Sequence, residues 1–521
     1  MTTGEGCTIG ASILAPMGEA VPSTTTNTAT RAAAAPRRPP RRLPRLLSEP
    51  MWVLGLVVLV DEIDKNIVRG MITPLKAEFG VGDLGISVML SLALLLNGLV
   101  TVPAGYLADR WNRSRAVGRT VVGWSALSAL GAASLNFPML VTLRAALGFG
   151  QAITEPSAAS LLGDYYLPER RGRAFSIHQV MLLGGTGLGV AIGGGLAAAF
   201  NWRVGLLVAA LPGLGVAWLV FRLREPRRGS ADLMAAIGGS IDDPDPGSDG
   251  DGGVADRADD APRLFDGGVR RFVRDMLVGL RDDLRTIMDI RTMRYALVGV
   301  AALLFTVTAI ASWLPQYYER HLNLDGGAGE AAFGLLAIAA GVPGVLVGGR
   351  VADRWAPRLT GGRLALPAVF LFVGTSCFTA SYLFRMPAGT TGADWSVIGP
   401  AYALQLAGLF IITMAIPGLR AGLTDALPAH LRGAGFAAFN LVSVVAGQAA
   451  APFIVGALSA SFDENLRTAF LIVTPFSFLG AAILFRARRF LDADMQKIMV
   501  AVLTALQEER DRAQERQAEP P

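Results

Sequence analysis

The stretch that decides the fold is LVVLVDEIDKNIVRGMI, residues 56–72. Apolar residues begin and end it, as in a helix that crosses a membrane, but its middle holds five ionisable side chains: Asp61, Glu62, Asp64, Lys65 and Arg69. At about 100° per residue, Lys65 and Arg69 fall within roughly 80° of Asp61, whereas Asp64 lies on the other flank, at about −60°. A charge at the bilayer centre costs about 2.5–3.5 kcal/mol on insertion scales. The sequence therefore predicts a helix whose broad polar face points into a bundle or a water cavity rather than into lipid.

The whole chain has the composition of an integral membrane protein. Of its 521 residues, 52% are hydrophobic and 17% are Asp, Glu, Lys or Arg, whereas about 25% are charged in an average soluble domain. About 20 helical residues cross a bilayer, and apolar runs of that kind begin near twelve residues: Trp52, Leu84, Val117, Met139, Ala174, Arg203, Arg294, Ala331, Leu364, Val397, Ala434 and Thr468. Because a segment in lipid must satisfy its own backbone hydrogen bonds, we expect an all-α polytopic membrane protein with twelve transmembrane helices in two six-helix halves.

Composition divides the chain into five parts: a disordered basic cytoplasmic arm (1–47), an N-terminal six-helix half (48–224), a cytoplasmic linker (225–292), a C-terminal six-helix half (293–488) and a cytoplasmic helical tail (489–521). The arm lacks the apolar core of a secretory signal, and it is either a segment drawn to anionic headgroups or an Arg-rich transit peptide. In the linker, residues 229–262 hold nine Asp and one Arg, which predicts disorder. Residues 263–290 have the period of an amphipathic helix.

The arginines predict the orientation. The loops at 109–119, 168–173 and 350–363 are rich in arginine, whereas the loops on the opposite side hold at most one basic residue each. Basic loops stay in the cytoplasm. We therefore expect a multi-pass protein of the cell (plasma or inner) membrane with both termini cytoplasmic.

The residues of metal and redox chemistry are scarce. The chain has two cysteines and three histidines: Cys7, Cys377, His178, His321 and His430. Their spacing fits neither a disulfide framework nor a zinc site, and we find none of the common hydrolase or nucleotide-binding motifs. We expect no enzyme activity, no metal, no cofactor and no nucleic-acid partner.

One motif recurs at equivalent places in the two halves. GYLADRWNRSR (105–115) and GRVADRWAPR (349–358) share the pattern G-x-x-A-D-R-W, and each follows the second span of its half. Twelve spans with this repeated loop resemble the major facilitator superfamily of secondary transporters, in which the loop latches the cytoplasmic side. The resemblance implies a latch formed by Gly105, Asp109, Arg110, Arg113, Asp164, Asp353 and Arg354. The alternative is that these residues only fix the topology.

Four segments resemble the spinster family of lysolipid and sphingolipid transporters. They are DEIDKNIVRGMITPLKAEFGVGDLG (61–85), RAALGFGQAITEPSAASLLGDYYLPERRGRAFS (144–176), GGTGLGVAIGGG (184–195) and LRGAGFAAFNLVSVVAGQAAAPFIVG (431–456). There are two departures. The family usually has Arg where this chain has Lys65, and in the fourth span it has Glu where this chain has Gln151. That Glu is thought to serve proton coupling in the family, and Glu155, one turn later, is our candidate to replace it.

The fourth span offers a second polar stripe, because Arg144, Gly148, Gln151 and Glu155 fall within about 60° of one another, with room expected at the glycine. One interpretation is a static ion pair that holds the first and fourth spans together. The other is that Asp64 or Glu155 gains and loses a proton while Lys65 or Arg144 binds an anionic headgroup. The candidates for proton coupling and headgroup binding are Asp61, Asp64, Lys65, Arg69, Arg144, Gln151 and Glu155. Four aromatic residues either line the apolar side of this site or pack in the core: Phe305, Trp313, Phe333 and Phe410.

The resemblance therefore predicts a secondary active transporter, coupled to protons, that moves a lysophospholipid-like amphipathic lipid across the membrane by alternating access. Its partners would be the lipid substrate and the bilayer, its driving force would be the proton gradient, and we expect a monomer. Because a fold does not fix a substrate, efflux of drugs, sugars or organic anions stays open. A gradient-independent lipid scramblase is the third interpretation.

Overall fold

The computed structural model describes residues 49–108, 112–226, 268–385, 387, 394–425 and 441–518. The predicted basic arm (1–47), the acidic part of the linker and the latch residues Asp109 and Arg110 lie outside these ranges.

The first half consists of helices that account for six spans. They are α2 (Pro50–Ile67), η1 (Val68–Met71), α3 (Ile72–Phe79), α4 (Asp83–Ala108), α5 (Arg113–Ala132), α6 (Phe137–Gln151), α7 (Thr154–Tyr165), α8 (Pro168–Ala199) and α9 (Trp202–Phe221). Asparagine side chains begin α5, α6 and α9, because Asn112, Asn136 and Asn201 each accept a hydrogen bond from the backbone N–H three residues later.

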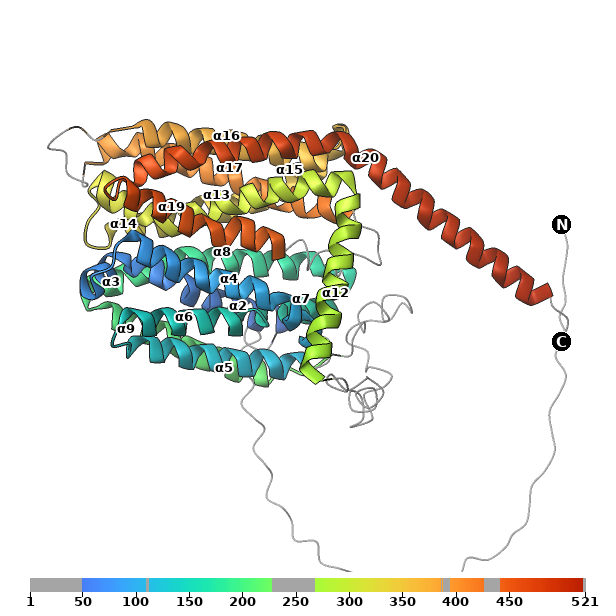
Figure 1. Cartoon of the computed structure of the whole chain (residues 1–521), viewed down its shortest axis with the longest axis horizontal. Helices are drawn as coiled ribbons and strands as arrows, with labels where there is room; N and C mark the ends of the chain where they lie inside the picture. Colours follow the sequence, from blue (N-terminus) through green and yellow to red (C-terminus); the bar gives the residue numbers. More distant parts are fainter. Residues whose placement is uncertain are drawn as a thin grey trace, which may run out of the picture. The chain divides into compact units, whose positions relative to one another are not determined.

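The second half repeats the arrangement. Its helices are α13 (Arg291–Leu322), α14 (Ala328–Leu336), η2 (Ala337–Gly341), α15 (Val342–Trp355), η3 (Ala356–Arg358), α16 (Gly362–Leu383), α17 (Trp395–Asp425), η5 (Val444–Ala449), α19 (Ala450–Ser461) and α20 (Leu466–Ala518). The spanning helices lie side by side, whereas the predicted amphipathic helix, α12 (Gly268–Asp289), runs across their ends (Figure 1). The last span and the predicted tail form one continuous helix, α20.

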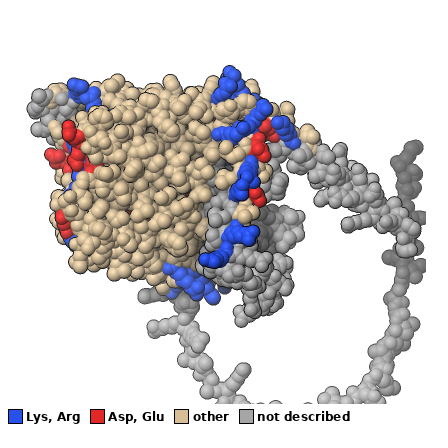
Figure 2. Space-filling model, in the orientation of Figure 1, with Lys and Arg blue, Asp and Glu red and all other residues tan. Residues whose placement is uncertain are grey.

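Within the described ranges, nine helices are long and apolar enough to cross a membrane. The other three predicted spans have local reasons for missing this criterion. The helix α2 carries four charged residues, and α5 begins with three arginines in two turns. The fourth span is divided into α6 and α7, because Pro156 has no N–H to donate to the carbonyl of Ala152. Figure 2 shows charged side chains at the two ends of the helices and an uncharged band between them.

The largest apolar cluster joins the two halves. It combines first-half residues such as Met71, Leu75 and Ile86 with second-half residues such as Phe333 and Val455. Two smaller clusters, centred on Val57 and on Leu161, have buried members from the first half only. The apolar contact between the halves therefore lies mainly in this largest cluster.

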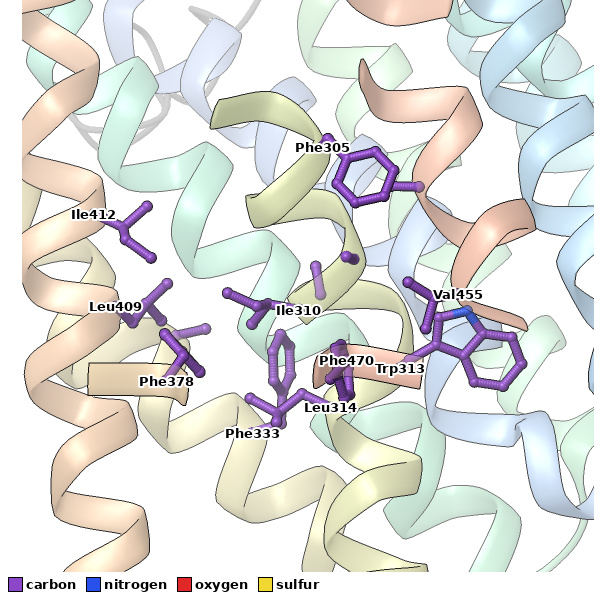
Figure 3. Close-up of a cluster of buried hydrophobic side chains, with 14 of the residues drawn as sticks. Phe305, Ile310, Trp313, Leu314, Phe333, Phe378, Leu409, Ile412, Val455 and Phe470 are labelled. Carbon is purple, nitrogen blue, oxygen red and sulfur yellow. The ribbon is translucent and has the colours of Figure 1, made fainter. Parts of the chain in front are cut away.

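Three of the aromatic residues considered as lining residues are core residues. Phe305, Trp313 and Phe333 are 3%, 0% and 2% exposed, and Figure 3 shows them within the apolar cluster around α13. Phe410 is partly buried against the same cluster. The packing interpretation is therefore correct for the first three.

Helix α8 approaches α2 backbone to backbone through its glycines. A Cβ on Gly193 would lie 2.2 Å from the carbonyl oxygen of Ile67, while a Cβ on Gly195 would meet nothing within 4 Å. Small residues allow such close approach in membrane bundles. The glycine run at 184–195 thus fixes the position of the charged first span.

We predict that Gly193→Ala destabilises the protein by about 1–3 kcal/mol, the usual cost of an overpacked contact. The measurement is the midpoint of thermal unfolding in detergent. Gly195→Ala is the matched control and should not lower the midpoint, because the added methyl meets nothing and alanine favours the helix. Equal midpoints for the two variants would contradict the close contact between α2 and α8.

Candidate functional site

Three neighbouring side chains on α2 form an acid–lysine triad of Asp61, Glu62 and Lys65. The Lys65 Nζ donates to Asp61 Oδ2 at 2.5 Å and to Glu62 Oε1 at 3.1 Å. The side chains of Asp61, Glu62 and Lys65 are 5%, 16% and 24% exposed. One ammonium group is thus shared by two carboxylates inside a membrane-spanning helix.

The polar face of α2 continues towards α8. Glu62 Oε2 accepts hydrogen bonds from Asn66 Nδ2 at 3.1 Å and from Thr186 Oγ1 of α8 at 3.2 Å. The guanidinium of Arg69 donates to the side-chain oxygen of Asn66. By contrast, Asp61 Oδ1 is buried and makes no hydrogen bond within the part of the chain that the structure describes.

Asp64 faces the opposite way, as its position on the other flank predicts. It is fully buried and accepts a hydrogen bond from Ser128 Oγ of α5. Arg144 of α6 lies 3.9 Å from Asp64 Oδ1 and donates to the Asp64 backbone carbonyl at 3.1 Å. The predicted coupling residues therefore divide into two groups, and Asp64 with Arg144 ties the first, third and fourth spans together.

The polar stripe predicted on the fourth span is only partly present. Gln151 is buried at the last residue of α6, but Glu155 follows the helix break and its side chain is exposed. The expected room at Gly148 does not exist, because a Cβ there would lie 2.2 Å from the backbone oxygen of Ala93 in α4. That prediction was wrong, because the glycine serves close packing of α4 on α6.

The first motif loop forms a buried clamp around Arg113. This side chain is 1% exposed and donates to Asp164 at 2.5 Å, to Glu225 at 2.8 Å and to Ser160 at 2.7 Å. Sequence reasoning missed Glu225. Its position as the first acidic residue after the sixth span is the signal that could have identified it. Although burial alone raises the pKa of Glu225, hydrogen bonds from the Ser114 N–H and from Arg113 outweigh it and lower that pKa.

The second motif loop makes no comparable clamp. Asp353 and Arg354 of α15 are exposed, and neither has a hydrogen bond or ion pair in the ranges that the structure covers. Gly105 lies in the last turn of α4, where the surrounding side chains are outside the described part. The two copies of the motif thus differ in their contacts.

A second ion-pair cluster, which sequence reasoning did not predict as a site, joins the halves. Asp83, the fully buried first residue of α4, accepts hydrogen bonds from Arg320 of α13 at 2.7 and 2.8 Å and from Ser459 of α19 at 2.7 Å. Lys76 donates to Asp83 at 2.8 Å and to Glu464 at 2.5 Å. We call this end of the bundle the Asp83 end, and the opposite end, with Arg113, the Arg113 end.

The halves are sealed at the Asp83 end. Members of the apolar cluster that joins them lie beside these ion pairs, since Leu75 directly precedes Lys76 in the chain. At the same interface Gly187 of α8 faces Gly334 of α14, and a Cβ on either would lie 2.8 Å from the carbonyl oxygen of the other. At the Arg113 end, the ion pairs of Arg113 lie within the first half and the Lys497–Asp494 pair lies within the second.

Two six-helix halves, sealed against each other at one end and holding an ion-pair triad inside a spanning helix, define a membrane transporter. The chain belongs to the Major Facilitator Superfamily, whose sequence model matches residues 54–452. It is therefore a transporter rather than an enzyme, and the predicted twelve-helix fold is confirmed.

Spinster proteins are similar to this chain over most of its length. Protein spinster homolog 3 of Danio rerio is 23% identical over 436 residues, covering 80% of this chain and 77% of the relative. The sphingosine-1-phosphate transporter SPNS2 of Danio rerio is 24% identical over 426 residues, covering 78% and 75%. A crystal structure of a bacterial homologue of the human lysosomal transporter Spinster, inward-facing and unoccupied, has a TM-score of 0.66 at 18% identity and covers 87% of this chain and 99% of its own. That last likeness shows the fold.

We predict that Asp83→Asn loosens the seal at the Asp83 end. Hydrogen bonds to a charged group contribute about 1.5–3 kcal/mol, so a cysteine placed at buried Ser87, beside Gly456 of the other half, should react with a maleimide about ten times faster. The measurement uses a background without Cys7 and Cys377. Glu78→Gln is the control, because Glu78 pairs with Arg203 inside the first half; equal rates in both variants would contradict the seal.

We also predict that Glu225→Gln lowers the unfolding midpoint at neutral pH by the equivalent of about 1.5–3 kcal/mol. Because the folded-state pKa of Glu225 is lowered, its contribution is complete above the ordinary value of 4.5 and disappears as the pH falls through the lower folded-state value. In thermal scans from neutral to acid pH, the difference in unfolding midpoint between the wild type and Glu225→Gln should disappear. Exposed Glu49 supplies the control variant, Glu49→Gln, and a gap that persists at low pH would contradict the clamp.

Proposed function

We propose that this protein is a proton-coupled transporter that moves lysophospholipid-like amphipathic lipids across the membrane by alternating access. The observation that carries this proposal is the acid–lysine triad, in which one ammonium group is shared by two carboxylates at membrane depth. An anionic headgroup would compete with the carboxylates for Lys65. A carboxylate that loses its cation away from water binds a proton more readily, so the binding of cargo and the binding of a proton would be linked through one positive charge.

The seal at the Asp83 end supports alternation. A carrier that opens to one side at a time needs contacts that close the other side, and the ion pairs around Asp83 supply them. Basic side chains gather at the Arg113 end, along α12 and its neighbours (Figure 2). We place that end in the cytoplasm, in a plasma or inner membrane, with both termini on the same side. The protein would act as a monomer and draw its energy from the proton gradient, without a cofactor.

The choice of a lipid rests on similarity and charge. A relative whose name gives sphingosine-1-phosphate as its cargo matches 78% of this chain, and Lys65 offers the cation that an anionic headgroup needs. Transport of drugs, sugars or organic anions by the same fold would replace this proposal. Lipid scrambling that needs no gradient would also replace it.

The test is reconstitution into liposomes with a panel of labelled lysophospholipids, with and without a pH gradient. For one proton exchanged per lipid, a gradient of about one pH unit should drive roughly tenfold accumulation, and an ionophore that collapses the gradient should abolish it. Lys65→Met should lose this accumulation. Movement of a soluble sugar or drug alone would overturn the lipid assignment, and lipid movement that ignores the ionophore would indicate a scramblase.

A further inference from the structure

We propose that Asp61 is the proton-carrying carboxylate of this transporter, with Glu62 retaining Lys65 while Asp61 is protonated. This inference rests on the proposed function, and it names the group within the triad that exchanges the proton.

The first argument is the charge balance of the triad. Asp61 and Glu62 carry two negative charges and Lys65 carries one positive charge, so the triad by itself has one carboxylate in excess, and the further cation on this face, Arg69, acts on Glu62. The triad lies inside a spanning helix, where an uncompensated charge is costly. One of the two acids is thus the natural site for a proton.

The two acids are not equivalent. Glu62 accepts hydrogen bonds from Lys65, from Asn66 and from Thr186, which stabilise its ionised form. Asp61 accepts from Lys65 alone, and its second oxygen, Oδ1, is buried without a partner among the described residues. A buried, unpartnered carboxylate oxygen favours the neutral acid, which assigns the proton to Asp61 rather than to Glu62.

Asp64 makes its contacts away from the triad. Its carboxylate accepts from Ser128 and faces Arg144, which also donates to the Asp64 carbonyl. These contacts come from two other helices, and Asp64 is fully buried. Because Arg144 balances the charge of Asp64, we do not expect the proton bound on cargo loading at Lys65 to go to Asp64.

The charged groups around the triad come from both halves. Glu155 of α7 interacts electrostatically with Lys65. His178 of α8, whose Nε2 is buried without a partner in the described part, interacts electrostatically with Glu155, with Arg420 of α17 and with Glu62 and Lys65 of the triad. Asp64 also acts electrostatically on Asp61. These groups set the field in which the headgroup and Asp61 compete for Lys65, and of the two acids of the triad Asp61 alone depends on Lys65 for all of its hydrogen bonds within the described residues.

The exchange step balances in atoms and charge. An anionic headgroup takes up one N–H donor of Lys65, the hydrogen bond from Lys65 to Asp61 breaks, and Asp61 binds one proton from water. Lys65 stays tethered to Glu62 throughout. When the headgroup leaves, Asp61 releases the proton and the Lys65–Asp61 pair forms again.

The experiment compares Asp61→Asn with Glu78→Gln, a control that removes a carboxylate charge from outside the triad, and with Asp64→Asn. Each variant is reconstituted in liposomes with a labelled lysophospholipid, and both gradient-driven uptake and exchange without a gradient are measured. We expect Asp61→Asn to keep exchange and to lose at least about tenfold gradient stimulation for one proton per lipid. Glu78→Gln and Asp64→Asn should remain stimulated.

A second measurement covers any variant that folds poorly. Proton uptake on adding the lysophospholipid is followed with a pH dye in weakly buffered detergent solution; the wild type should bind one proton per lipid and Asp61→Asn none. Gradient-stimulated uptake or proton binding by Asp61→Asn would overturn the assignment of the proton to Asp61. A wild type without gradient stimulation would instead overturn the proposed coupling, so the two failures are distinguishable.

Discussion

The constraint on which the rest of the structure depends is the cost of keeping charges inside a membrane-spanning helix. Five ionisable residues on and just after α2 can exist there only because other groups compensate them. Asp64 is paired across the bundle with Arg144, while Lys65 is held by Asp61 and Glu62 on its own helix. The glycines of α8 bring a second polar helix to within van der Waals contact of this segment. The site and the packing of the first half thus follow from the same requirement.

Much of the fold could be predicted from the sequence, because hydropathy and arginine placement report directly on the bilayer. The twelve spans, the two halves and the repeated motif loop were all visible in this way. The helical wheel also placed Asp64 apart from Lys65, as the structure does. Periodicity is a local property, and it placed the side chains of α2 correctly because no helix break interrupts α2 between Asp61 and Lys65.

What the sequence could not provide depends on tertiary contact. Gly148 suggested open space, but a glycine can equally admit a neighbouring backbone, and here α4 occupies that position. Pro156 displaced Glu155 from the stripe by breaking the fourth span. The cluster at Asp83 was invisible because Lys76, Asp83 and Arg320 are solitary charges in separate loops and helix ends. Their meeting requires the two halves to be assembled.

The two components of the seal at the Asp83 end respond to different physical variables. The contact of Gly187 with Gly334 rests on dispersion between backbones and has no directional bond to break. The neighbouring ion pairs are partly accessible at Lys76 and Glu464 and are weakened by dissolved salt. Ionic strength would therefore weaken the ion pairs while leaving the glycine contact intact, so the two halves would stay in contact along α8 and α14 in high salt.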